Sequence, residues 1–203
     1  SRMSNRRILW SGGFDSTFMV LDALRSGDKV EPYYVRLSPD GQSWQKQRRE
    51  QAAIERIVTA LPNELVNGLR SPTPIPIILH DFWASYCKHW RELKDRADGS
   101  LFSQQTPLLS AIGEMLDGIE VGLVIGDSAL VGPSSDLLDA YQVARPLNGL
   151  TKAQIYKTAA ASGFDEYLRM TWSCEGNNSE AISGVCGKCE PCRRRLLPQV
   201  AFV

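Results

Sequence analysis

The sequence lacks an excess of charge of either sign, because 23 lysine and arginine residues balance 23 aspartate and glutamate residues. A protein that binds nucleic acid regardless of sequence needs a basic excess, so this balance argues against nucleic acid as a partner. Long apolar runs are also missing. Runs such as Ile75–Leu79 and Val121–Ile125 are far shorter than the roughly 20 residues that cross a bilayer. The start, Ser1-Arg2-Met3, has no apolar signal-peptide core. We therefore expect a cytoplasmic protein without a membrane partner.

Cysteine is scarce over most of the chain, since four of the five cysteines fall in the last 30 residues. Disulfides are disfavoured in a reducing compartment, so this cluster indicates a metal site. The apolar fraction of 43% and the charged fraction of 23% are typical of a globular protein. At 203 residues we expect one main domain, residues 4–168, and a small C-terminal module, residues 169–203, in which cysteine, glycine and basic residues dominate.

Strand-like and helix-like segments alternate along the first four-fifths of the chain. Short apolar segments that predict strands lie at Arg7–Trp10, Val30–Leu37, Ile75–Leu79 and Val121–Ile125. Amphipathic segments that predict helices lie at Phe14–Leu24, Ser43–Leu61, Leu108–Leu116 and Thr151–Ala161, with an insertion helix in Phe82–Ser103. This alternation predicts an α/β fold with a parallel sheet and helices on both faces.

A glycine-rich loop stands between the first strand and the first helix. It reads Ser11-Gly12-Gly13-Phe14-Asp15-Ser16-Thr17. Its glycines permit a tight turn, and the N-terminus of the following helix adds N–H donors and a positive dipole end, so the loop is suited to hold a phosphate. The loop is neither a Walker A sequence nor the three-glycine dinucleotide motif. The alternative is a plain turn in which Ser16 or Thr17 caps the helix.

The C-terminal cysteines Cys174, Cys186, Cys189 and Cys192 have the spacing C-x11-C-x2-C-x2-C. Four thiolates that converge on one point favour tetrahedral zinc, and a site with four protein ligands leaves no open position, which indicates a structural role. An iron–sulfur cluster and two labile disulfides remain as alternatives.

With both motifs in view, the chain resembles the 7-cyano-7-deazaguanine synthase family of the queuosine pathway. The resemblance rests on the loop, which is similar to the PP-loop of ATP pyrophosphatases, on Ile125-Gly126-Asp127, on Arg145-Pro146-Leu147 with Thr151-Lys152, and on the segments around the four cysteines. It implies a PP-loop ATP-pyrophosphatase fold, zinc bound by the four cysteines, and a homodimer, for which the aromatic segment Phe82–Trp90 is our candidate interface.

The resemblance also implies a reaction. ATP would adenylate the carboxylate of 7-carboxy-7-deazaguanine and release pyrophosphate, with Mg²⁺ as a second cofactor. Ammonia would then attack the acyl adenylate to give an amide, and a second ATP-dependent round in the synthase converts the amide to the nitrile. A carboxylate needs such activation because oxide is a poor leaving group, whereas AMP is a good one.

The resemblance assigns roles to individual residues. Asp15 would hold Mg²⁺, Asp127 is a second candidate for this ion, and Lys152 would place positive charge at the departing pyrophosphate. The residues expected to bind nucleotide are Ser11, Gly12, Gly13, Phe14, Asp15, Ser16, Thr17, Val35, Gly126 and Lys152. The residues expected to bind substrate are Asp127, Asp136 and Trp172, of which Asp136 would accept from a guanine-like edge and Trp172 would stack on the ring. The alternatives are a loop or capping role for the aspartates, a solvated Lys152, and a Trp172 that covers the metal module.

Two segments depart from the family pattern. Ser103-Gln104-Gln105-Thr106-Pro107 stands where the synthase carries Pro-Gly-Arg-Asn, and Ser38–Trp44 replaces a compact Gly-Gln turn. A diverged relative, such as those found in antiphage defence, would keep adenylation and transfer the activated deazaguanine to another amine, for example a protein N-terminus. A non-catalytic nucleotide-binding module is the other alternative, against which the intact loop argues.

Overall fold

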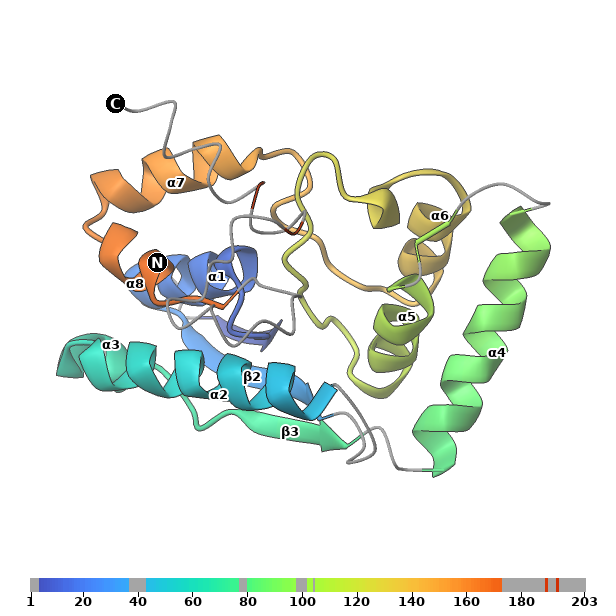
Figure 1. The fold of residues 1–203 in the computed structure, drawn as a ribbon, viewed down its shortest axis with the longest axis horizontal. Helices are drawn as coiled ribbons and strands as arrows, with labels where there is room; N and C mark the ends of the chain where they lie inside the picture. The colour runs from blue at the N-terminus through green and yellow to red at the C-terminus, as the bar shows by residue number, and fades with distance from the viewer. Residues whose placement is uncertain are drawn as a thin grey trace.

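The computed structural model describes residues 4–36, 43–76, 80–97, 102, 103, 105–172, 189 and 193. A parallel sheet of three strands lies at its centre, in the order β1 (Asn5–Leu9), β2 (Lys29–Arg36), β3 (Thr73–Pro76). The sheet continues past β1 through single parallel bridges from Ile8 to Glu120 and from Glu120 to Ala144. The expected α/β fold with a parallel sheet is therefore confirmed (Figure 1).

Two predicted strands differ from the structure. The strand expected at Val121–Ile125 is reduced to the bridge at Glu120, because the Leu123 N–H turns back to the Val121 carbonyl at 3.1 Å and interrupts the ladder. The strand expected at Ile75–Leu79 is β3, which begins at Thr73; residues 77–79 lie outside the described part. Within the described sheet, β3 is an edge strand and contains two prolines. Proline has no backbone N–H to donate, and at an edge no further described strand needs that hydrogen bond.

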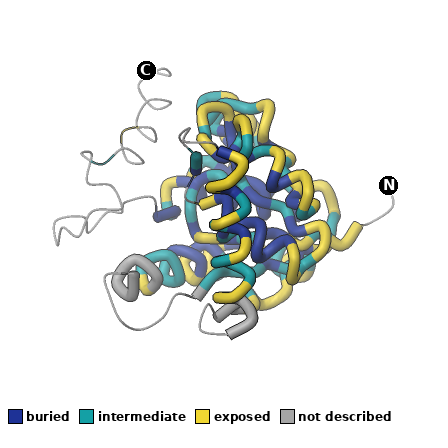
Figure 2. The backbone as a smooth tube through the Cα atoms, turned by 90° about the vertical axis from the view of Figure 1, so that its right-hand side faces the viewer, coloured by how far each residue is buried: buried dark blue, intermediate teal, exposed yellow. Residues whose placement is uncertain are grey.

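Helices cover both faces of the sheet. Alternate residues of a strand point to opposite faces, and accordingly Ile8 belongs to one apolar core while Leu9 packs against another. The first core includes residues of α1 (Phe14–Arg25), α2 (Ser43–Ala60), α7 (Lys152–Ala161) and α8 (Asp165–Arg169), with α3 (Asn63–Val66) beside it. The second includes residues of α5 (Thr106–Met115), α6 (Gly132–Ala140) and the 3₁₀ turn Ser128–Leu130. Figure 2 shows the buried segments gathered in the interior, with exposed segments around them.

Helices α1 and α7, which supply Asp15 and Lys152, begin and end within one residue of the predicted positions. Helix α1 is followed by Gly27, whose φ of 84° is one that glycine adopts readily. Helix α7 is capped by Thr151, whose Oγ1 accepts from the Gln154 N–H at 3.2 Å in a capping box, and it is followed by Gly163. The start of α7 is therefore fixed in position, and Lys152 is its first residue.

The expected insertion helix is α4 (His80–Ala97), which is held against α5 by polar contacts. Lys88 donates to the Glu114 carboxylate at 2.8 Å, and the buried His89 ring nitrogen lies 3.0 Å from the same group. The hydrogen bonds from Lys88, Ser85 and His89 lower the pKa of Glu114 to about 2. None of the helices in the described part of the chain is both long enough and apolar enough to span a membrane.

Helix α4 carries the aromatic residues that we considered as a dimer interface. Trp83, which is 58% exposed, stacks on Tyr86 with ring centroids 5.4 Å apart, and Tyr86 stacks on Trp90 at 6.4 Å. The homodimer remains a prediction.

Candidate functional site

The glycine-rich loop makes a tight turn directly after β1. Gly12 has a φ of 71°, and a Cβ at this position would lie 2.6 Å from the Glu50 carbonyl oxygen, so only glycine fits without displacing α2. Gly13 is the N-cap of α1. The loop thus points the first N–H groups of α1 toward the end of the sheet, as a phosphate site requires.

The hydroxyl groups of the loop have different neighbours. The Ser16 hydroxyl lies 3.2 Å from the Ser11 hydroxyl and donates to the Gly13 carbonyl at 3.3 Å. The hydroxyl groups of both serines therefore form hydrogen bonds with other groups of the loop. The Thr17 hydroxyl is fully buried and accepts from the Trp10 indole N–H at 2.9 Å. Thr17 therefore fastens the helix to the strand, and Ser11 and Ser16 are the hydroxyls nearer to the cavity.

The two predicted catalytic residues lie together, although 137 residues separate them in the sequence. The Lys152 ammonium, at the start of α7, lies 2.5 Å from Asp15 Oδ2 on the first turn of α1. It also lies 5.6 Å from the centroid of the Phe14 ring. The Lys152 side chain is 22% exposed, so it is more enclosed than a solvated surface lysine. The pair places one positive and one negative group beside the phosphate loop.

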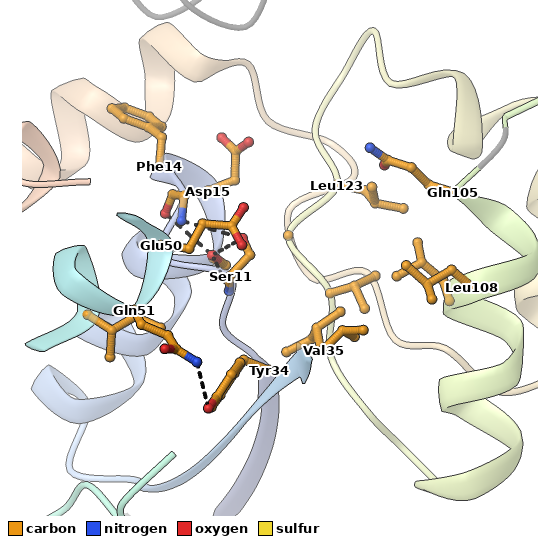
Figure 3. Close-up of a pocket in the computed structure, with 17 residues that line it drawn as sticks. Ser11, Phe14, Asp15, Tyr34, Val35, Glu50, Gln51, Gln105, Leu108 and Leu123 are labelled. Carbon is orange, nitrogen blue, oxygen red and sulfur yellow. Dashed lines mark hydrogen bonds between the residues drawn. The ribbon is translucent and has the colours of Figure 1, made fainter. Parts of the chain in front are cut away.

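A cavity of about 310 Å³ opens at the loop, and its two ends differ in polarity (Figure 3). Ser11, Gly13, Phe14, Asp15 and Ser16 form one end. The opposite wall is mostly apolar and consists of Leu9, Val35, Leu108, Leu109, Val121, Gly122 and Leu123, with Gln105 at its edge. Of the residues expected to bind nucleotide, the cavity therefore brings together five loop residues and Val35.

A further side of the cavity is lined by Tyr34, Glu50 and Gln51. Sequence reasoning did not predict these three residues as part of the site. Tyr34 lies on β2, and Glu50 and Gln51 lie on α2 in the turn that passes over Gly12. Gln51 donates to the Tyr34 hydroxyl at 2.8 Å. A motif-based search offers no signal for these residues, because their position depends on how α2 docks on the loop.

Gly122 was also missed. A Cβ at Gly122 would lie 2.9 Å from the Ser16 backbone nitrogen and 3.2 Å from the Asp15 Cβ. The segment after the Glu120 bridge therefore passes directly beside the first turn of α1, and a side chain at this position would collide with it. This close approach narrows the cavity next to Asp15.

Gly126, Asp127 and Asp136 are expected site residues that do not line the described cavity. Gly126 is exposed with a φ of 96°, and Asp127 Oδ2 accepts from the Val124 N–H at 2.7 Å in the same turn. Asp136 is exposed on α6. Nucleotide binding by Gly126 and substrate binding by the two aspartates remain predictions.

Trp172 contacts the glycine-rich loop through its backbone. Its backbone N–H donates to the Gly12 carbonyl at 2.9 Å, its side chain is buried, and the Arg49 guanidinium lies 4.8 Å from its ring centroid. Trp172 belongs to the expected C-terminal module, of which Cys174, Cys186 and Cys192 lie outside the described residues and Cys189 is partly exposed. No metal-binding group of three or more side chains occurs among the residues that the structure describes. Zinc thus remains a prediction.

Part of the chain is similar to a known protein family. The model of the family described as Queuosine biosynthesis protein QueC matches residues 129–200, which include Asp136, Lys152, Trp172 and the four C-terminal cysteines. A crystal structure of the predicted subunit of a tRNA methyltransferase from Methanocaldococcus jannaschii is similar at 12% identity with a TM-score of 0.46, over 78% of this chain and 74% of that chain. No curated protein shows a significant match. The match over residues 129–200 shows that about a third of the chain is similar to the QueC family.

Proposed function

We propose that this protein uses ATP to adenylate the carboxylate of 7-carboxy-7-deazaguanine, after which an amine attacks the acyl adenylate. The observation that carries the proposal is the Asp15–Lys152 pair beside a cavity with a phosphate-type loop at one end and an apolar wall along the other. That polarity matches a nucleotide, which has a flat base and a charged phosphate chain. The similarity of residues 129–200 to the QueC family supports an ATP-using enzyme of the PP-loop type.

The chain's own residues account for ATP binding. The N–H groups at the start of α1 and the positive end of its dipole would hold the phosphates beside Ser11 and Ser16. The apolar side chains of Leu9, Val35 and Leu123 would contact the adenine ring. Val35 stands at the carboxyl end of β2, which is where ligands bind in open parallel sheets.

Charge compensation is the second requirement, because pyrophosphate leaves with several negative charges. Asp15 would hold Mg²⁺ through its carboxylate, which is the oxygen ligand that this ion prefers, and bound Mg²⁺ would neutralise phosphate charge. The Lys152 ammonium lies 2.5 Å from Asp15 and would stabilise the negative charge that develops on the leaving group. Asp127, Asp136 and Trp172 stay our candidates for the deazaguanine side.

Mass spectrometry of the products tests the proposal. The protein would be incubated with ATP, Mg²⁺, ammonium and 7-carboxy-7-deazaguanine, and we expect AMP, pyrophosphate and an amide or nitrile. A nitrile would show the complete synthase reaction. An adenylate or amide that goes no further would indicate a diverged ligase with another acceptor, such as a protein N-terminus in a defence system. Absence of AMP formation with this acid, when ATP binds, would contradict the proposed substrate.

We further propose that the four C-terminal cysteines bind one structural zinc ion. A Cys189→Ser substitution is expected to remove most of the bound zinc and to unfold the C-terminal module, because metal binding and folding of such modules are coupled. Elemental analysis would measure zinc and iron per chain, and limited proteolysis would report on the module. Cys87→Ser is the control, since Cys87 lies on α4 within the main domain. A Cys189→Ser protein that keeps its metal would refute the assignment, and iron in place of zinc would correct it.

A further inference from the structure

A second cavity adjoins the nucleotide cavity on the side of α2. It has a volume of about 350 Å³ and is lined by Tyr34, Gln51, Ile54, Glu55, Val58, Thr59 and Pro72. Three of these residues, Tyr34, Gln51 and Ile54, also line the first cavity. The two cavities therefore share a wall made of one residue from β2 and two from α2.

A single side-chain hydrogen bond spans that wall. Gln51 Nε2 donates to the Tyr34 hydroxyl at 2.8 Å, and both side chains are only partly buried. Figure 3 shows the pair at the end of the first cavity away from Phe14 and Asp15. Because a hydrogen bond between two partly exposed side chains contributes little net stability, a rotation of the Gln51 side chain costs little and would join the two cavities.

The charge of the second cavity limits what enters it. Among the described residues that line it, Glu55 is the only charged one, and its carboxylate is exposed. This negative charge repels ATP and carboxylate substrates and attracts a small cation. The apolar side chains of Ile54, Val58 and Pro72 offer no anchor for a phosphate or a second carboxylate.

We propose that the second cavity admits ammonium or a small primary amine, and that the amine reaches the acyl adenylate through the Tyr34–Gln51 wall. The inference rests on the proposed function, because it requires an acyl adenylate in the first cavity. In the step, the amine nitrogen bonds to the acyl carbon while the bond from that carbon to the AMP oxygen breaks. AMP leaves with the bonding electron pair. Ammonium loses two protons to solvent water, one before the attack and one after it.

A tryptophan that fills the second cavity tests this route. Thr59→Trp is expected to raise the KM for ammonium by about tenfold or more, while ATP–pyrophosphate exchange with the acid stays within about twofold. Thr158→Trp on α7 is the matched control. Thr158 is also an exposed helix residue whose hydroxyl donates to a carbonyl four residues earlier, at 3.0 Å against 2.8 Å for Thr59. An unchanged ammonium KM in a folded Thr59→Trp protein would overturn the inference.

A second variant covers the case in which Thr59→Trp does not fold. Glu55→Gln keeps the size of the cavity and removes its charge, so we expect a KM for ammonium several times higher at low ionic strength and a smaller difference at high salt. An ammonium KM equal to that of the wild type at low salt would also count against the route. Loss of ATP–pyrophosphate exchange in the wild-type protein would instead refute the proposed function, so the two failures are distinguishable.

Discussion

Asp15→Asn is expected to lower pyrophosphate release by about a hundredfold or more and to leave the fold intact. The substitution keeps the shape of the side chain and removes the charge that lies 2.5 Å from the Lys152 ammonium. It also removes the carboxylate that we expect to hold Mg²⁺, while Asn retains only a neutral oxygen ligand. Pyrophosphate release with ATP and the acid measures the effect, and circular dichroism with thermal unfolding measures the fold.

Asp22→Asn is the matched control for this prediction. Asp22 lies on the same helix and pairs with Arg25 at 2.9 Å, but this pair is more exposed and does not line the described cavity. We expect its pyrophosphate release to equal that of the wild type. A Lys152→Met variant should also lose activity, and the double variant should lose little more, because the two residues act as one unit. Full activity in Asp15→Asn would remove the basis of the proposed site.

Gly12→Ala is expected to abolish ATP binding and to destabilise the protein. The methyl group would lie 2.6 Å from the Glu50 carbonyl oxygen, so α2 must move away from the loop. The residue would also adopt a φ of 71°, which for a side chain other than glycine costs about 1–2 kcal/mol. Isothermal titration with ATP and urea unfolding would measure the two effects.

Gly118→Ala separates the effect of the steric contact with Glu50 from the effect of the positive φ. Gly118 has a φ of 69°, and a Cβ there would meet nothing within 4 Å. It therefore carries the conformational cost alone, and we expect a modest loss of stability with unchanged ATP affinity. Equal effects of the two alanines on stability and on binding would show that contact between the loop and α2 is unimportant.

The sequence predicted the parts of the site that depend on neighbouring residues. The turn at Gly12 and Gly13, the start of α1 and the capped start of α7 follow from glycine freedom, dipole ends and capping, which are local. Sequence reasoning assigned Asp15 and Lys152 to the same phosphate chemistry, but it did not predict the contact between their side chains. No local rule places those two side chains together across most of the chain.

Other parts depend on packing and were missed for that reason. Tyr34 and Gln51 meet only because α2 docks on the loop, and the amphipathic pattern of α2 says which side is buried without naming its partner. The strand expected at Val121–Ile125 is apolar enough, but Gly122 must pass beside Asp15 and Ser16, and the ladder stops there. Strand length is thus set by tertiary contact.

The hydrogen bond from the Trp172 N–H to the Gly12 carbonyl has a consequence for regulation. It joins a residue near the start of the expected C-terminal module to the backbone of the phosphate loop. Two ligands that order the same stretch of backbone help one another, and the help is equal in both directions. A nucleotide that orders the loop would therefore tighten the hold of the C-terminal module on its metal, and a module that has lost its metal would weaken the hold on nucleotide to the same degree.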